Sequence, residues 1–182
     1  MKALVIYESM YGNTRRVAQV VAAALGALPE VRLVHADDAL AEDVAGADLV
    51  VIGAPTHAWG LPRANTRRGA STKTVTSEGL ALEPGADTKS GVRELLTTLR
   101  AHELRGWFAA FDTRRRGPRW LTGRASTTIA AELTRLGMRE LVSAESFYVD
   151  RRDHLIDGEL DRAASWGERL RHDAAAHVSH SA

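Results

Sequence analysis

Short, mostly apolar runs alternate with longer amphipathic segments along the chain. The apolar runs occupy residues 2–7, 31–35, 48–53, 106–111 and 141–149. Apolar runs of this length are typical of strands that are buried on both faces, as in a parallel sheet. The segments between them repeat apolar residues at helical spacing. A strand-helix unit repeated five times predicts an α/β fold, in which helices cover both faces of a parallel sheet.

The predicted helices cover residues 13–28, 90–102, 125–136 and 156–176, and the acidic stretch 36–46 holds a short helix or turn. The 182 residues fit one domain with a single core. We predict one domain over residues 1–176, with a frayed tail at 177–182. Residues 61–87 show neither helical nor strand periodicity, so they are predicted to form a long insertion or lid.

The amino-acid composition excludes several classes of protein. An apolar content of 45% and a charged content of 26% are ordinary for a globular domain. The chain has no cysteine, which excludes disulfides, thiolate catalysis and cysteine-based metal sites, and we expect no metal centre. No apolar run approaches the ~20 residues of a membrane span, and the first residues lack the basic stretch and long apolar core that are typical of a signal peptide. We therefore expect a cytoplasmic protein. The net charge of +1 gives no field that would favour nucleic acid.

The first apolar run leads into a hydroxyl-rich turn, residues 9–14, and then directly into an amphipathic segment. Backbone N–H groups and the positive end of the helix dipole meet at such a place, which favours phosphate binding. We expect Asn13 or Thr14 to be the N-cap. Gly12 is the only glycine in the turn and no lysine lies there, so dinucleotide fingerprints and Walker loops are excluded. The pattern favours a mononucleotide phosphate.

The stretch Ser9-Met10-Tyr11-Gly12-Asn13-Thr14 resembles the phosphate loop of flavodoxins, [ST]-x-[ST]-G-x-[TS]. It departs from that pattern at Tyr11, where we expect the backbone to serve instead of a short hydroxyl side chain. The resemblance extends over residues 1–176. It implies a three-layer sandwich with a five-stranded parallel sheet in the order 2-1-3-4-5. Residues 55–60 also look like the Pro-Thr-x-aromatic-Gly segment of flavodoxin-like quinone reductases.

The resemblance implies FMN as the cofactor. Its phosphate would lie on residues 9–14, and its ring would lie between the loops after strands three and four. Thr56 would add a hydroxyl, Trp59 would stack on the ring, and the backbone at 112–114 would face its pyrimidine edge. His57 is a candidate proton donor to the reduced flavin, and Trp120 a candidate cover for its outer face. The candidate cofactor-binding residues are Ser9, Met10, Tyr11, Gly12, Asn13, Thr14, Pro55, Thr56, His57, Ala58, Trp59, Gly60, Asp112, Thr113 and Arg114.

Arginines gather in the loop predicted after strand four. They are Arg114, Arg115, Arg116, Arg119 and Arg124. Positive charge beside a flavin favours its reduced, anionic form, by the Coulomb logic that shifts a pKa. The cluster would therefore stabilise reduced flavin or attract an anionic substrate or partner. The alternative is a solvated loop whose charges are screened.

These observations predict an FMN-binding redox protein, either an electron carrier or a small oxidoreductase. Its partner would be a redox protein or a small anionic or quinone substrate, as in protoporphyrinogen-type or quinone-type oxidoreductases. One alternative is a cofactor-free domain that binds a protein partner. A signalling receiver is rejected because Ala54-Pro55 stands where its phospho-acceptor aspartate belongs, and because Glu8 is a lone acid after strand one. No catalytic residue and no oligomeric state are assigned.

Overall fold

A parallel β-sheet forms the middle layer of the protein. The computed structural model describes residues 1–57, 60–63, 82–84, 86, 89–117 and 123–179. The strands are β1 (Lys2–Tyr7), β2 (Glu30–His35), β3 (Leu49–Pro55), β4 (Trp107–Arg115), β5 (Arg139–Glu140) and β6 (Glu145–Val149). The helices are α1 (Asn13–Leu25), α2 (Ala41–Ala45), α4 (Val92–Leu99), α6 (Ala125–Arg135) and α7 (Glu159–Ser179).

The strand order is β2-β1-β3-β4-β5, with β6 also paired to β4 and every pairing parallel. This confirms the predicted order and fold class. However, two short strands, β5 and β6, share the fifth position of the sheet beside β4. β5 lies beside Trp107 and Phe108, while β6 lies beside residues 111–115 of the same strand. The sequence predicted one strand over 141–149, but residues 141–144 interrupt the pairing with β4.

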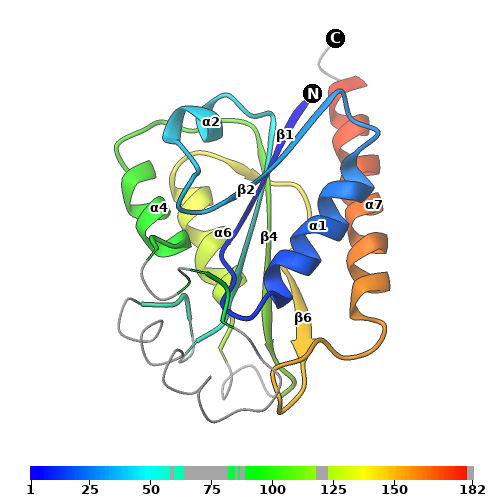
Figure 1. Ribbon diagram of the computed structural model, residues 1–182. Helices are drawn as coiled ribbons and strands as arrows, with labels where there is room; N and C mark the ends of the chain where they lie inside the picture. The colour runs from blue at the N-terminus through cyan, green and yellow to red at the C-terminus, as the bar shows by residue number, and fades with distance from the viewer. Residues whose placement is uncertain (58–59, 64–81, 85, 87–88, 118–122, 180–182) are drawn as a thin grey trace.

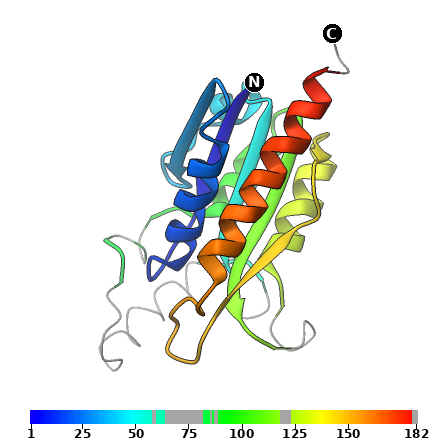
Figure 2. The ribbon, with the colours of Figure 1, turned by 90° about the vertical axis from the view of Figure 1, so that its right-hand side faces the viewer.

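Two groups of helices cover the sheet, as predicted. α2, α4 and α6 pack on one face through a core that includes Ile6, Ile52 and Leu96. α1 and α7 lie side by side on the other face, over Val5, Val51 and Phe111 (Figure 2). The carboxyl ends of β1, β3 and β4 lie at one end of the sheet, and the start of β1 and the last turn of α7 lie at the opposite end (Figure 1).

The ring of Phe111 packs closely against the backbone of Gly53 and helps to hold α7 on the sheet. A Cβ on Gly53 would lie 2.0 Å from Cζ of Phe111, so only glycine leaves room for this ring. The Phe111 ring meets Phe147 and Trp166 edge-on, with centroids 5.9 Å away in both cases. Trp166 belongs to α7 and is 1% exposed. The aromatic cluster therefore joins β4, β6 and α7.

The predicted end of strand four was wrong. Residues 112–115 continue β4 instead of forming a loop, because all four pair with β6 and the first two also pair with β3. The register places Asp112 beside Ala54 and Thr113 beside Pro55. α7 also continues to Ser179, where the sequence predicted fraying after Ala176. The ring of His177 stacks on Trp107 with a centroid separation of 4.1 Å, which holds the end of the helix.

Candidate functional site

The backbone of the first loop leaves the N-terminus of α1 open. Gly12 is the N-cap, with φ of 82° in the left-handed region, and no side chain caps the helix. The prediction of Asn13 or Thr14 as N-cap was wrong, because both already lie inside the helix. The first turn also contains no acidic residue. Its N–H groups and the helix dipole therefore have no anion supplied by the helix itself.

Ser9 gives the clearest indication of a ligand-binding site. The residue is 2% exposed, and its Oγ has no hydrogen-bond partner among the described residues. A buried hydroxyl without a partner costs free energy, so such atoms are rare and call for an explanation. A phosphate oxygen at this loop would accept its hydrogen. The orphaned hydroxyl, the open helix end and Gly12 together fit a phosphate group.

The other loop residues bind protein groups. Met10 is 1% exposed and packs against Ala86, with Tyr11 at the border of the same cluster. The amide of Asn13 donates to the carbonyl of Asp153, which ties the loop to the turn after β6. Thr14 is buried, and its Oγ1 lies 2.7 Å from Oγ1 of Thr113 on β4. The structure therefore brings the first loop and the end of β4 together.

The second loop begins as a continuation of β3. The N–H of Thr56 donates to the carbonyl of Thr113, and its Oγ1 accepts from the N–H of Ala125 at 2.9 Å. His57 and Gly60 exchange backbone hydrogen bonds with each other. Pro55 is buried at the end of β3. Ala58 and Trp59 lie outside the described residues, as do Arg119 and Trp120 and positions 64–81, 85 and 87–88 of the predicted insertion.

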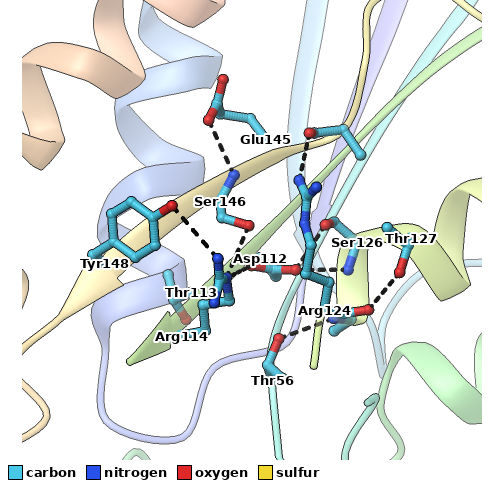
Figure 3. Close-up of polar contacts among 12 residues, drawn as sticks. Thr56, Asp112, Thr113, Arg114, Arg124, Ser126, Thr127, Glu145, Ser146 and Tyr148 are labelled. Atoms are coloured by element: carbon cyan, nitrogen blue, oxygen red, sulfur yellow. Dashed lines mark hydrogen bonds and ion pairs between the residues drawn. The ribbon is translucent and has the colours of Figure 1, made fainter. Parts of the chain in front are cut away.

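A buried polar network stands at the carboxyl end of β4 (Figure 3). Asp112 is fully buried, and its Oδ2 accepts from both N–H and Oγ–H of Ser126, at 2.9 and 2.7 Å. Ser126 lies in the first turn of α6, so Asp112 serves as the anion at the N-terminus of that helix. Its Oδ1 lies 3.9 Å from Nε of Arg114 and has no hydrogen-bond partner among the described residues.

The side chain of Arg114 is 4% exposed and is held on several sides. Its guanidinium donates to Oγ of Ser146 and to the carbonyl of Gly117, both at 3.2 Å. It also lies over the ring of Tyr148, 5.1 Å from the centroid. The positive charge of Arg114 is therefore compensated inside the protein by Asp112, instead of being presented by a loop as the sequence predicted.

Exposed arginines surround the same edge of the sheet. We call Arg16, Arg115, Arg116, Arg151 and Arg152 the basic rim; all five are exposed. Arg115 donates to the carbonyl of Arg151 and to the carboxylate of Asp153, at 3.3 Å in each case. Asp153 has φ of 61°, unusual for a residue with a side chain. Its hydrogen bonds with Asn13 and Arg115 hold this conformation, so the rim is fixed to the phosphate loop.

A cavity of about 220 Å³ adjoins the loop between the ends of β1 and β2. Its charged residues are Arg15, Asp38, Glu83 and Lys89, and its neutral polar residues are Tyr7, Ser9 and His35. Burial and the charge of Glu83 raise the pKa of Tyr7. Burial and the charge of Lys89 lower the pKa of His35. The Nδ1 of His35 also accepts the N–H of Asp37 at 3.1 Å, which requires this nitrogen to be unprotonated.

His35 predicts how stability depends on pH. Because its pKa is lower in the folded state, the unfolded chain takes up this proton first as the pH falls below about 6.5. The contribution of neutral His35 to the free energy of unfolding is therefore complete above about pH 6.5. It is lost as the pH falls through the pKa of His35 in the folded state. His35→Gln should therefore reduce the difference between urea unfolding midpoints at pH 7.5 and 5.5. Exposed His102→Gln is the matched control; an unaltered difference in His35→Gln would contradict this account.

Two carboxylates near the loop have structural contacts that the sequence did not predict. Glu8 is 3% exposed, and its Oε2 accepts the N–H of Val92 in the first turn of α4. Glu83 lies against the phosphate loop, where its N–H donates to the carbonyl of Met10 at 2.8 Å. Both contacts join residues far apart in sequence, so no local pattern could have indicated them.

Chemically, the described residues offer an anion site with hydroxyl and backbone donors. Among them, no group of three or more histidine and acidic side chains is placed to hold a metal ion. No helix in the described part of the chain is long and apolar enough to cross a bilayer.

Comparison with known proteins agrees with this geometry. A family model for a flavodoxin domain matches residues 4–67. A flavodoxin from Aquifex aeolicus is 43% identical over 68 residues, which cover 34% of this chain and 37% of that protein. The chain thus matches little more than a third of that relative's length.

Solved structures extend the likeness in fold. Flavodoxin 2 from Bacillus cereus superposes with a TM-score of 0.67 at 18% identity, covering 94% of this chain and 99% of that one. A flavodoxin from the domain Archaea gives a TM-score of 0.64 at 16% identity, covering 96% and 99%. The chain is therefore similar to flavodoxins in sequence over its first third, and it has the flavodoxin fold over nearly its whole length.

Proposed function

We propose that this protein binds FMN and transfers electrons through it. The proposal is carried by the buried hydroxyl of Ser9, which has no hydrogen-bond partner among the described residues and lies beside the uncapped N-terminus of α1. The flavodoxin-like fold adds support, because ligands of open α/β sheets bind beyond the carboxyl ends of the strands at the point where the strand order reverses. That point lies between β1 and β3 in this protein.

The roles of the chain follow from its contacts. Ser9 and the first N–H groups of α1 would hold the phosphate. Thr14 and Thr113 hold the first loop against β4, and Asn13 holds it against the turn after β6. Thr56 fixes the start of the second loop on α6, and the sequence assigns the neighbouring Trp59 to stacking on the ring. When bound, FMN supplies the redox chemistry, and the protein supplies binding, orientation and electrostatics.

A visible absorption spectrum tests this function. The purified protein should be yellow, or should become so with one equivalent of FMN, and dithionite should bleach the colour reversibly. A protein that remains colourless after incubation with FMN would contradict the proposal. That result would favour the alternative reading, a domain that binds a protein partner without a cofactor.

The basic rim suggests an anionic redox partner, either an acidic protein surface or a small anionic or quinone-type substrate. Among the described residues, Arg116, Arg151 and Arg152 have no carboxylate within ion-pair distance. Electrostatic attraction of this kind accelerates encounter with an acidic partner and weakens with added salt.

The rim also sharpens a prediction about the reduction potential. Arg114 is compensated by Asp112 and Arg115 by Asp153, so Arg116 has the least compensated charge of the three. Arg116→Gln should lower the potential of bound FMN by on the order of 10 mV, because it removes positive charge that favours the reduced form. Arg115→Gln should have a smaller effect. Spectroelectrochemistry at low salt measures the reduction potential of FMN bound to each variant. If the potential of Arg116→Gln equals that of the wild type, solvent screens the charge of Arg116 and the loop does not tune the flavin.

A further inference from the structure

Glu83 places a carboxylate directly beside the proposed phosphate site. Its N–H donates to the carbonyl of Met10, and its Oε1 lies 3.5 Å from the position that a Cβ on Gly12 would occupy. Gly12 is the N-cap of α1, so this oxygen stands at the helix end where an anion is expected. The inference below rests on the proposed FMN function.

The Glu83 carboxylate is poorly solvated and strongly paired. Its side chain is 16% exposed, and Oε1 lies 2.6 Å from Nε of Arg15, whose side chain is 48% exposed. At this distance the two opposite charges attract each other strongly. Among the described residues, no other group donates a hydrogen bond to Oε1. The charge of Glu83 also raises the pKa of Tyr7 across the cavity, so its field reaches the surrounding groups.

Neighbouring contacts keep the carboxylate in place. The backbone bond to Met10 fixes Glu83, and Leu82 and Ala86 pack against Met10 and Tyr11. A glutamine at position 83 has nearly the same shape as glutamate and keeps the backbone bond. It therefore removes the charge without moving the segment.

We propose that Glu83 is a specificity-determining residue that weakens the binding of highly charged phosphates at the loop. A bound phosphate monoester adds up to two negative charges next to this carboxylate, and like charges repel. Arg15 is then shared between Glu83 and the phosphate. Riboflavin lacks the phosphate and is not repelled in this way. The preference of the site for FMN over riboflavin is therefore smaller than it would be without the charge of Glu83.

The experiment compares FMN with riboflavin by quenching of flavin fluorescence. Dissociation constants for both flavins are measured with the full-length wild type, Glu83→Gln, Arg15→Gln and the control Glu103→Gln, an exposed acid outside the site. The measured quantity is the preference, the dissociation constant for riboflavin divided by that for FMN. Riboflavin reports on folding and on the ring site, so the preference isolates the phosphate.

The two partners of the ion pair should give opposite results. Glu83→Gln should raise the preference for FMN about tenfold and leave riboflavin affinity unchanged, since one repulsive charge is lost and Arg15 is released. Arg15→Gln should lower the preference by a similar factor, and Glu103→Gln should not change it. A purely structural ion pair would shift both variants in the same direction and for both flavins.

The outcomes separate the two proposals. If wild type and Glu83→Gln bind both flavins with the same preference, or if Glu83→Gln lowers it, the role of Glu83 is refuted while FMN binding stands. If neither flavin binds any of the four proteins, the proposed function itself fails, and the inference fails with it.

Discussion

Asp112→Ala is expected to lower the free energy of unfolding by about 3–5 kcal/mol, because it removes one partner of a buried ion pair. The substitution removes both hydrogen bonds from Ser126 at the start of α6. It also removes the nearest carboxylate to the Arg114 guanidinium, in a place where both side chains are almost completely buried. Urea unfolding of the cofactor-free protein measures the loss.

Three further variants identify the source of that loss. Ser126→Ala should cost only about 1 kcal/mol, the net value of a typical hydrogen bond. Asp112→Asn keeps an oxygen acceptor and should fall between the two. The double variant Asp112→Leu, Arg114→Met replaces the pair with apolar groups and should lose less than the sum of its single variants. An Asp112→Ala protein within about 1 kcal/mol of wild type would show that the network contributes little to stability.

Ser9→Ala should have opposite effects on stability and on binding. Removing a buried hydroxyl without a partner relieves a desolvation cost, so the cofactor-free protein should gain about 1 kcal/mol. The same change removes a hydrogen bond to a charged phosphate, worth about 1.5–3 kcal/mol, so FMN affinity should fall about 10- to 100-fold. Urea unfolding and flavin fluorescence measure the two quantities on the same preparations.

Ser126→Ala is the matched control for Ser9→Ala. Both serines are buried, but the hydroxyl of Ser126 donates to Asp112 whereas that of Ser9 has no partner among the described residues. The control should therefore lose stability where Ser9→Ala gains it. If Ser9→Ala also destabilises the protein and leaves FMN affinity unaltered, its hydroxyl is satisfied within the protein and the phosphate assignment fails.

The sheet could be predicted from the sequence because its signals are local. Apolar runs at 2–7 and 48–53 are long enough to indicate buried strands, and the strand order followed from the resemblance carried by residues 9–14. Gly12 is the only glycine in its loop, but the sequence did not predict it as the N-cap. Asn13 and Thr14 are common N-caps, yet here their side chains bind Asp153 and Thr113, so the glycine in the left-handed region stands before the helix instead.

The end of β4 could not be predicted, for a physical reason. Asp112, Thr113 and Arg114 are polar, and such a run after an apolar strand is typical of a loop. Their polar groups are satisfied only by partners on other elements, namely Ser126 on α6, Thr14 on α1 and Ser146 on β6. The same holds for Glu83, which meets the phosphate loop across a long stretch of chain. Polar contacts between residues far apart in the chain produce no periodic pattern in the sequence, so they could not be predicted from it.

A crystal structure of the protein grown with FMN tests the phosphate assignment most directly. The phosphate should lie within hydrogen-bond distance of Ser9 Oγ and of the backbone N–H groups at the start of α1, and Glu83 should be displaced from Gly12 or share Arg15 with the phosphate. A flavin whose phosphate lies elsewhere, with the hydroxyl of Ser9 still unpartnered, would contradict the assignment.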